Sequence, residues 1–139
     1  MDINVKGVHN GPVRIGVLGL GYVGLPVALG FAKKFKVVAY DLDSKRIQQL
    51  RQNIDKNKEF SATQLIARSK NIKYTDFCYD LADCNFYIIC VPTPIDEYNV
   101  PDLSYLISAT SIVGQVLDEH NTIVYESTVY PGCTRQIAK

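Results

Sequence analysis

A turn with three spaced glycines is the feature that most limits how this chain can fold. The segment 15–26 reads IGVLGLGYVGLP and joins an apolar, strand-like run to a helical pattern. Gly19 permits a tight turn off the strand, and Gly21 has no Cβ, so an anion can approach the backbone. Gly24 allows the new helix to pack closely on the strand. The amides of residues 20–23 then point from a helix N-terminus, which favours an anion such as a pyrophosphate.

The surrounding sequence indicates a strand, a helix and a second strand. Residues 14–18 are strand-like, and apolar residues recur at helical spacing over 23–31. A second strand-like run, 36–40, is followed by Asp41, about 20 residues beyond the first glycine. An acid at that position accepts hydrogen bonds from both hydroxyls of an adenosine ribose and repels a 2′-phosphate. The pattern favours NAD over NADP, although Arg46 supplies a nearby cation and keeps NADP open.

Composition and charge exclude several classes of protein. The chain has 139 residues, 47% of them hydrophobic, which is enough for one domain with a buried core. The formal net charge is +1, and no basic cluster is interleaved with aromatics, so we expect no nucleic-acid partner. A signal-peptide pattern and an apolar run of transmembrane length are both missing, so we expect a cytoplasmic protein without membrane contact. The four cysteines lack zinc-site spacing, so we expect free thiols and no metal.

The rest of the chain alternates between helical and strand-like patterns. A helix is expected after a cap at Asp43 or Ser44, and a short one at the capping-box pattern of residues 61–64. The charged segment 52–60 between them is expected to be an exposed connection. Further strands are expected at 71–75, 86–91 and 122–126, a helical turn within 76–84 with Leu81 inward, a long helix opening at 101–104 with Leu106, Val113, Val116 and Leu117 buried, and a last helix beginning at Cys133.

This alternation is typical of an α/β protein with a Rossmann-type, doubly wound parallel sheet, for which we expect the strand order 3-2-1-4-5. Two more loops then join the glycine turn at one edge of the sheet. The first is 91–94, where two prolines force the chain out of the fourth strand, and the second contains Ser127 and Thr128. Ligands bind at the carboxyl ends of strands in such sheets, so the loops are expected to form one crevice for an extended dinucleotide.

Three stretches together resemble one enzyme family: GLGYVGLP at 19–26, VPTP at 91–94 and ESTVYPG at 126–132. In order and spacing they look like the amino-terminal, NAD-binding domain of the UDP-glucose/UDP-N-acetylmannosamine 6-dehydrogenases. The resemblance covers residues 13–139. Residues 1–12 are mostly polar and show no hydrophobic period, so we expect them to be a flexible leader.

Three further segments look most like one branch of this family. They are 94–96, 101–103 and 125–134. The branch acts on UDP-N-acetylhexosamines for Vi-antigen-type and capsular polysaccharide biosynthesis.

The resemblance implies a two-step oxidation of the sugar C6 alcohol to a carboxylate, which uses two NAD and one water. In the family a cysteine on a later domain captures the intermediate aldehyde, so this chain is expected to be a fragment, truncated before the catalytic domains and inactive alone. The UDP-sugar is expected to bind mainly through those later domains. We expect the full-length protein to be a homodimer or larger.

The resemblance also implies roles for individual residues. Tyr22 and Val23 would offer amides to the pyrophosphate, and Asp41 would hold the adenosine ribose with Arg46 near it. The full set of expected NAD-binding residues is Gly19, Leu20, Gly21, Tyr22, Val23, Gly24, Asp41, Arg46, Val91, Pro92, Thr93, Ser127 and Thr128. Thr128 is in addition an accessory catalytic residue. Cys133 is interpreted as a cap or packing residue and not as the nucleophile.

Two other functions stay open on the sequence. One is a stand-alone module that binds or senses NAD. The other is a methyltransferase, whose fold also uses a glycine loop and an acid after its second strand. Gly24 and the two proline-containing loops argue against the methyltransferase.

Overall fold

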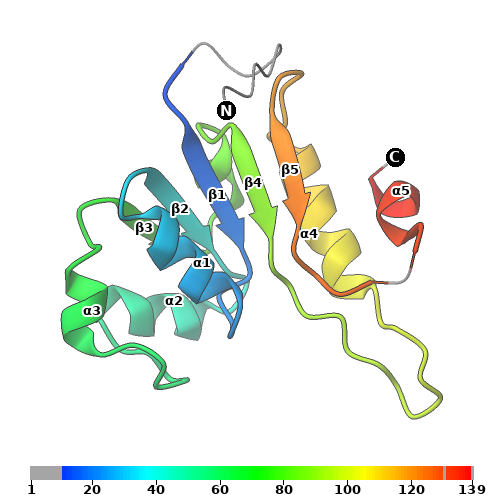
Figure 1. Ribbon diagram of the computed structural model, residues 1–139, viewed down its shortest axis with the longest axis horizontal. Coiled ribbons are helices and arrows are strands. Elements are labelled where there is room, and N and C mark those ends of the chain that lie inside the picture. Colours follow the sequence, from blue (N-terminus) through cyan, green and yellow to red (C-terminus); the bar gives the residue numbers. More distant parts are fainter. Residues whose placement is uncertain (1–10, 130, 139) are drawn as a thin grey trace, which may run out of the picture.

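The computed structural model describes residues 11–129 and 131–138, and its centre is a five-stranded parallel sheet (Figure 1). All neighbouring strands pair in parallel, in the order β3-β2-β1-β4-β5. This confirms the predicted Rossmann-type topology. The strands are β1 (Arg14–Leu18), β2 (Lys36–Tyr40), β3 (Ile72–Thr75), β4 (Phe86–Ile89) and β5 (Thr122–Tyr125).

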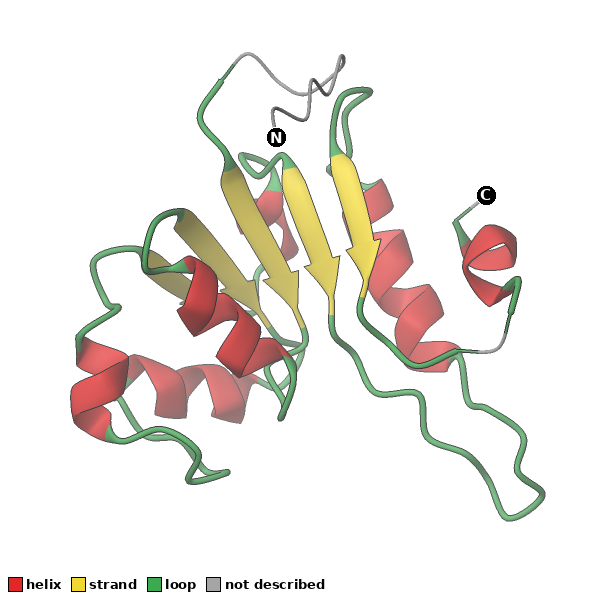
Figure 2. Ribbon diagram, viewed as in Figure 1, coloured by secondary structure: helices red, strands yellow, loops and turns green. Residues whose placement is uncertain are grey.

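Helices cover both faces of the sheet, and each face has its own hydrophobic cluster. Counted along the chain, the first three helices contribute buried residues to one cluster, and the last three helices contribute buried residues to the other. The helices are α1 (Gly24–Phe31), α2 (Ser44–Arg51), α3 (Ala62–Ile66), the 3₁₀ helix η1 (Cys78–Leu81), α4 (Ser104–Gly114) and α5 (Cys133–Ile137). Figure 2 shows that the loops leaving β1, β4 and β5 emerge at the same edge of the sheet.

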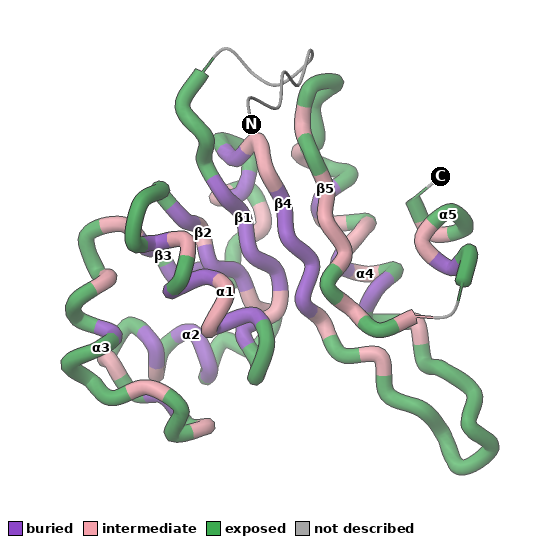
Figure 3. The backbone as a smooth tube through the Cα atoms, in the orientation of Figure 1, coloured by how far each residue is buried: buried purple, intermediate pink, exposed green. Residues whose placement is uncertain are grey.

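The central strands are buried on both faces, as their continuous apolar runs predict (Figure 3). Val17 packs in the first cluster and its neighbour Leu18 in the second, because successive side chains of a strand point to opposite faces. Tyr87 is fully buried, and its hydroxyl lies 2.8 Å from the carbonyl oxygen of Cys84 and 3.0 Å from that of Leu81, so its one hydrogen is donated to these carbonyls. The polar atom of this aromatic residue is therefore satisfied inside the core.

The local signals for the shorter elements are confirmed. The Asp43 side chain accepts hydrogen bonds from the amides of Lys45 and Arg46 and caps α2. Ser61 forms the predicted capping box with Gln64 at the start of α3. Leu81 is fully buried, as expected.

The fourth helix is shorter than its apolar pattern predicts. It ends at Gly114, and the amide of Val116 bonds the carbonyl of Val113 in a tighter turn. Leu106 and Val113 are buried as predicted, Val116 is partly buried beyond the helix, and Leu117 is exposed. Glycine has a low helix propensity, which fits a helix end at this residue.

The expected flexible leader, residues 1–12, lies mostly outside the described residues and stays a prediction. Within the described part of the chain, no helix has the length and apolar character needed to cross a bilayer.

All four cysteines are free, and Cys84, Cys90 and Cys133 are buried. Cys90 belongs to the core, as predicted. Cys133 lies in the second cluster, the position of a packing residue.

Candidate functional site

A groove of about 540 Å³ lies at the carboxyl ends of β1, β2 and β4. Three of the segments that line it follow strands and are far apart in sequence: the glycine turn at 18–23, residues 40–43 at the end of β2, and residues 90–92 after β4. Its walls are mostly apolar with a few polar groups, the usual composition of a small-molecule site. The fold therefore brings the glycine turn, Asp41, Val91 and Pro92 together, as predicted from sequence.

Two glycines of the turn are required by the protein itself. Gly19 has a left-handed backbone, φ +90°, and a Cβ there would lie 3.1 Å from backbone atoms of Cys90 and Val91. A Cβ on Gly24 would overlap the carbonyl oxygen of Gly19, so the helix packs directly on the turn. Gly21 differs, because a Cβ there would meet nothing within 4 Å.

The start of α1 is left open toward the groove. Val23 occupies the cap position without a side-chain hydrogen bond, and the first turn contains no acidic residue. Tyr22 and Val23 are exposed and line the groove. No side chain therefore takes the place of an anion at this helix end. Gly21 has no Cβ, so its backbone is accessible from the groove. These features fit the pyrophosphate of a dinucleotide.

Asp41 is bonded to the glycine turn. Its Oδ2 accepts a hydrogen bond of 2.7 Å from the amide of Leu20, and its Oδ1 accepts one of 2.9 Å from the amide of Asp43. An ionised carboxylate has about four acceptor positions, so two remain for the hydroxyls of a ribose. Asp41 is half-buried at the groove wall.

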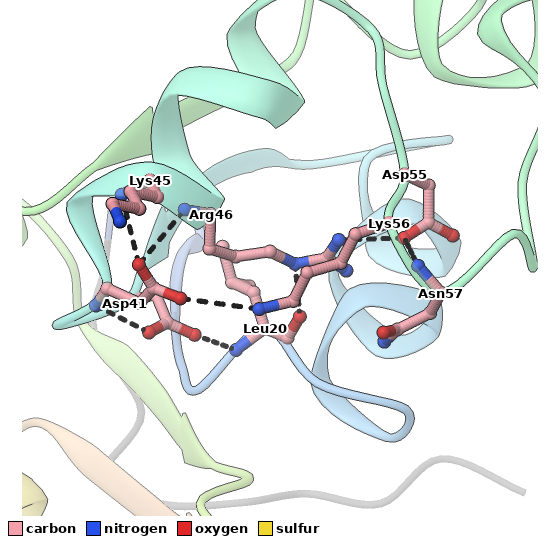
Figure 4. A network of polar contacts seen from close by, with 8 residues as sticks. Leu20, Asp41, Lys45, Arg46, Asp55, Lys56 and Asn57 are labelled. Carbon is pink, nitrogen blue, oxygen red and sulfur yellow. Dashed lines mark hydrogen bonds and ion pairs between the residues drawn. The ribbon is translucent and has the colours of Figure 1, made fainter.

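Arg46 lies behind the turn and not in the groove (Figure 4). Its side chain is 2% exposed, its Nε donates a 3.0 Å hydrogen bond to the carbonyl of Leu20, and its Nη1 donates one of 2.8 Å to Asp55. Its Nη2 has no hydrogen-bond partner. The guanidinium is thus engaged with the protein. The expected position of Arg46 near a ribose stays a prediction.

Asp55 corrects the expectation that 52–60 is simply an exposed connection. Most of that segment is exposed or half-buried, but the Asp55 side chain is fully buried against Arg46. Burial acts to raise the pKa of Asp55, and the hydrogen bonds from Arg46 and the amides of Asn57, Phe60 and Glu59 outweigh it, so the pKa is lowered. Polarity counts cannot detect such a residue, because pairing decides whether a charge can be buried.

Two side-chain hydrogen bonds join the loops after β4 and β5. The Ser127 hydroxyl donates to the carbonyl of Val91 at 2.7 Å, and the Thr93 hydroxyl donates to the carbonyl of Thr128 at 2.7 Å. Val91 lines the groove, so these bonds attach the second loop to its wall. Gly24, Thr93, Ser127 and Thr128 are not among the residues that line the groove itself.

Sequence reasoning missed the contribution of α4. Tyr105, Ala109 and Ile112 form an apolar wall of the groove, although they lie far from the glycine turn in the sequence. Their spacing of four and three residues places them on one side of a helix, and this signal was present in the sequence. Among the described residues, no group of three or more His, Cys, Asp or Glu side chains is placed to hold a metal ion.

The fold and the groove at its switch point define a Rossmann-type domain of the dinucleotide-binding class. Residues 13–139 match the family model described as "UDP-glucose/GDP-mannose dehydrogenase family, NAD binding domain". The chain belongs to this family. The match gives the methyltransferase alternative no support.

Named relatives share much of this chain's sequence. It is 48% identical over 124 residues to the UDP-N-acetyl-D-glucosamine 6-dehydrogenase of Salmonella typhi, a match that covers 89% of this chain and 29% of that protein. It is also 48% identical to protein CapL of Staphylococcus aureus, over 88% of this chain and 28% of the relative. The chain thus spans less than a third of the length of these relatives.

Solved structures share the fold. The UDP-D-ManNAc dehydrogenase of Pyrococcus horikoshii has a TM-score of 0.85 and 38% identity, covering 91% of this chain and 31% of that one. A UDP-glucose dehydrogenase from Pyrobaculum islandicum has a TM-score of 0.83 and 28% identity, covering 96% of this chain and 32% of that one.

Proposed function

We propose that this chain is the NAD-binding domain of a nucleotide-sugar 6-dehydrogenase, which oxidises the C6 alcohol of a UDP-N-acetylhexosamine, or of UDP-glucose, to a uronate. The observation that carries the proposal is one groove that combines an uncapped helix start, an open Gly21 and the Asp41 carboxylate. The name of the Salmonella typhi relative, a UDP-N-acetyl-D-glucosamine 6-dehydrogenase, supports the hexosamine. A role in polysaccharide biosynthesis for capsule or Vi antigen follows only from the sequence resemblance and stays a prediction.

Each part of the groove has a task in holding the cofactor. The amides of Gly21, Tyr22 and Val23 would bind the pyrophosphate, and Asp41 would accept the ribose hydroxyls. The apolar residues Leu42, Tyr105, Ala109 and Ile112 offer a wall for the adenine ring.

Several residues position the cofactor without chemistry of their own. Gly19, Leu20 and Gly24 shape the turn, while Val91 and Pro92 line the crevice. Thr93 and Ser127 hold the two loops together, and Thr128 would act as an accessory residue near the reacting centre. Bound NAD supplies the hydride acceptor, and the protein's contribution is placement.

The position of Arg46 favours NAD over NADP. A 2′-phosphate needs a cation beside the ribose, and the guanidinium of Arg46 is buried on Asp55 and Leu20. The Asp41 carboxylate repels such a phosphate. The cation that kept NADP open on the sequence is therefore occupied elsewhere.

Calorimetric titration of the 139-residue chain tests the proposal. We expect NAD to bind, and we expect the affinity for NADP to be at least about tenfold lower. Binding of S-adenosylmethionine without NAD, or equal binding of NAD and NADP, would overturn it. A stand-alone module that binds or senses NAD is the alternative, and the two are distinguished by whether the encoded protein continues beyond Lys139 with the relatives' later domains. The homodimeric state of the full-length protein and its cytoplasmic location stay predictions.

A further inference from the structure

The Arg46–Asp55 pair is buried directly under the glycine turn. Its side chains are 2% and 0% exposed, and Arg46 Nη1 lies 2.8 Å from Asp55 Oδ1. Asp55 also accepts hydrogen bonds from the amides of Asn57, Glu59 and Phe60, at 3.1, 2.9 and 3.1 Å. The carboxylate is thus held by its own loop, and it in turn holds the guanidinium in one orientation.

Arg46 transmits this constraint to one peptide unit of the turn. Its Nε donates to the carbonyl oxygen of Leu20 at 3.0 Å. That carbonyl shares a planar trans peptide with the amide of Gly21, so the Gly21 N–H points away from Arg46. The amide of Leu20 is held as well, by its 2.7 Å bond to Asp41 (Figure 4). Both peptide units that flank Leu20 are therefore fixed from inside the protein.

We propose that Asp55 is a positioning residue for the phosphate-binding turn. It orients Arg46, and Arg46 sets the direction of the Leu20–Gly21 peptide so that the Gly21 N–H is presented to the pyrophosphate. Arg46 thus serves the cofactor through the backbone, because its guanidinium is buried and bonded to Leu20 and Asp55. This inference rests on the proposed function of the groove.

Two ligands separate an effect on the turn from a general loss of structure. ADP carries a pyrophosphate and needs the turn, whereas adenosine engages Asp41 and the apolar wall alone. We expect Asp55→Asn to weaken the binding of ADP to the 139-residue chain about tenfold and to change adenosine binding less than about twofold. Nuclear magnetic resonance titration measures both, and the Gly21 amide signal reports the contact directly: ADP shifts it in the wild type and shifts it less in the variant.

A second variant keeps the proposal testable if Asp55→Asn folds poorly. Arg46→Lys retains a cation for Asp55 but lacks the planar fork that reaches both Asp55 and Leu20, so it is expected to lose ADP affinity in the same way. Lys56→Gln is the matched control in the same loop, because its ion pair with Asp43 is about half exposed. Leu81→Ala controls for lost stability, since it opens a cavity in the other hydrophobic cluster.

The outcomes are distinct. Equal losses of ADP and adenosine affinity in Asp55→Asn or Arg46→Lys, or ADP affinity unchanged in both, overturn the positioning role. An equal loss of ADP affinity in Leu81→Ala also overturns it, because general destabilisation then accounts for the effect. Failure of the wild-type chain to bind ADP or NAD overturns the proposed function instead.

Discussion

The three glycines of the turn are each explained by a different physical reason. Gly19 needs a left-handed backbone, and Gly24 must lack a side chain because the carbonyl of Gly19 occupies that space. The protein has room for a side chain at Gly21. We therefore expect the reason for a glycine at that position to lie in a ligand that would approach the bare backbone.

This difference gives a matched pair of substitutions. Gly21→Ala is expected to leave the free energy of unfolding within about 0.5 kcal/mol of the wild type, and to weaken NADH binding about tenfold because the methyl group meets the pyrophosphate. Gly24→Ala is expected to lower the free energy of unfolding by about 3 kcal/mol, since the overlap is with backbone. Urea unfolding and fluorescence titration with NADH measure the two quantities.

Gly30→Ala is the control, because Gly30 is exposed in α1 and its new Cβ meets nothing within 4 Å. It is expected to stabilise the helix by about 0.5–1 kcal/mol without changing NADH affinity. Wild-type NADH affinity in Gly21→Ala would contradict the close approach of the cofactor to this residue.

At the scale of elements, a loop and a helix are joined by one buried ion pair. The segment 52–60 contributes Asp55, and α2 contributes Arg46. Desolvating two charges is costly, and the cost is offset here by the hydrogen bonds that both partners make to backbone groups. An otherwise polar, exposed segment is in this way attached at a defined position beneath the turn.

The lowered pKa of Asp55 makes this attachment sensitive to acid. A carboxyl whose pKa in the folded protein is below its unfolded value, about 3.9, stabilises the fold above that pH, and the contribution is lost as the pH falls through the folded-state pKa. We expect the free energy of unfolding of the wild type to fall steadily from about pH 5 downward. Asp55→Asn is expected to flatten that dependence.

Urea titrations at a series of pH values measure it. Asp83→Asn removes an exposed carboxylate that lies 3.9 Å from Arg14 and serves as the control. Parallel pH curves for the wild type and Asp55→Asn would contradict a role for Asp55 in acid sensitivity.

For the whole molecule, the sheet order decides where chemistry can occur. It places the glycine turn and the loops after β4 and β5 at one edge, and the bonds from Ser127 and Thr93 hold those two loops together. The chain covers less than a third of its named relatives. We therefore expect binding of cofactor and oxidation of sugar to be separable properties.

A turnover assay tests that separation. The purified 139-residue chain with NAD and UDP-N-acetylglucosamine, UDP-N-acetylmannosamine or UDP-glucose is expected to form no NADH, measured by absorbance, under conditions in which it binds NAD. An intact UDP-sugar 6-dehydrogenase is the positive control. Formation of NADH by the chain alone would show that it contains the complete catalytic site.

The sequence by itself determined the order of strands and helices, the glycine turn, the acid after the second strand and the caps of α2 and α3. These features follow from hydrophobic periods and from local steric rules, which act between residues close in the chain. The end of α4 at Gly114 was less well predicted, because an apolar pattern can continue past the last helical residue.

Only the tertiary structure decided the burial of Arg46 against Asp55 and the wall that α4 adds to the groove. The sequence placed Arg46 near the expected ribose and left Asp55 in an exposed connection, and their pairing depends on how loop 52–60 folds back beneath the turn. Tyr105 reaches the groove because the crossover after β4 returns α4 to the same edge of the sheet. A charge or an aromatic ring acquires its role from neighbours distant in sequence, and the folded chain alone brings those neighbours together.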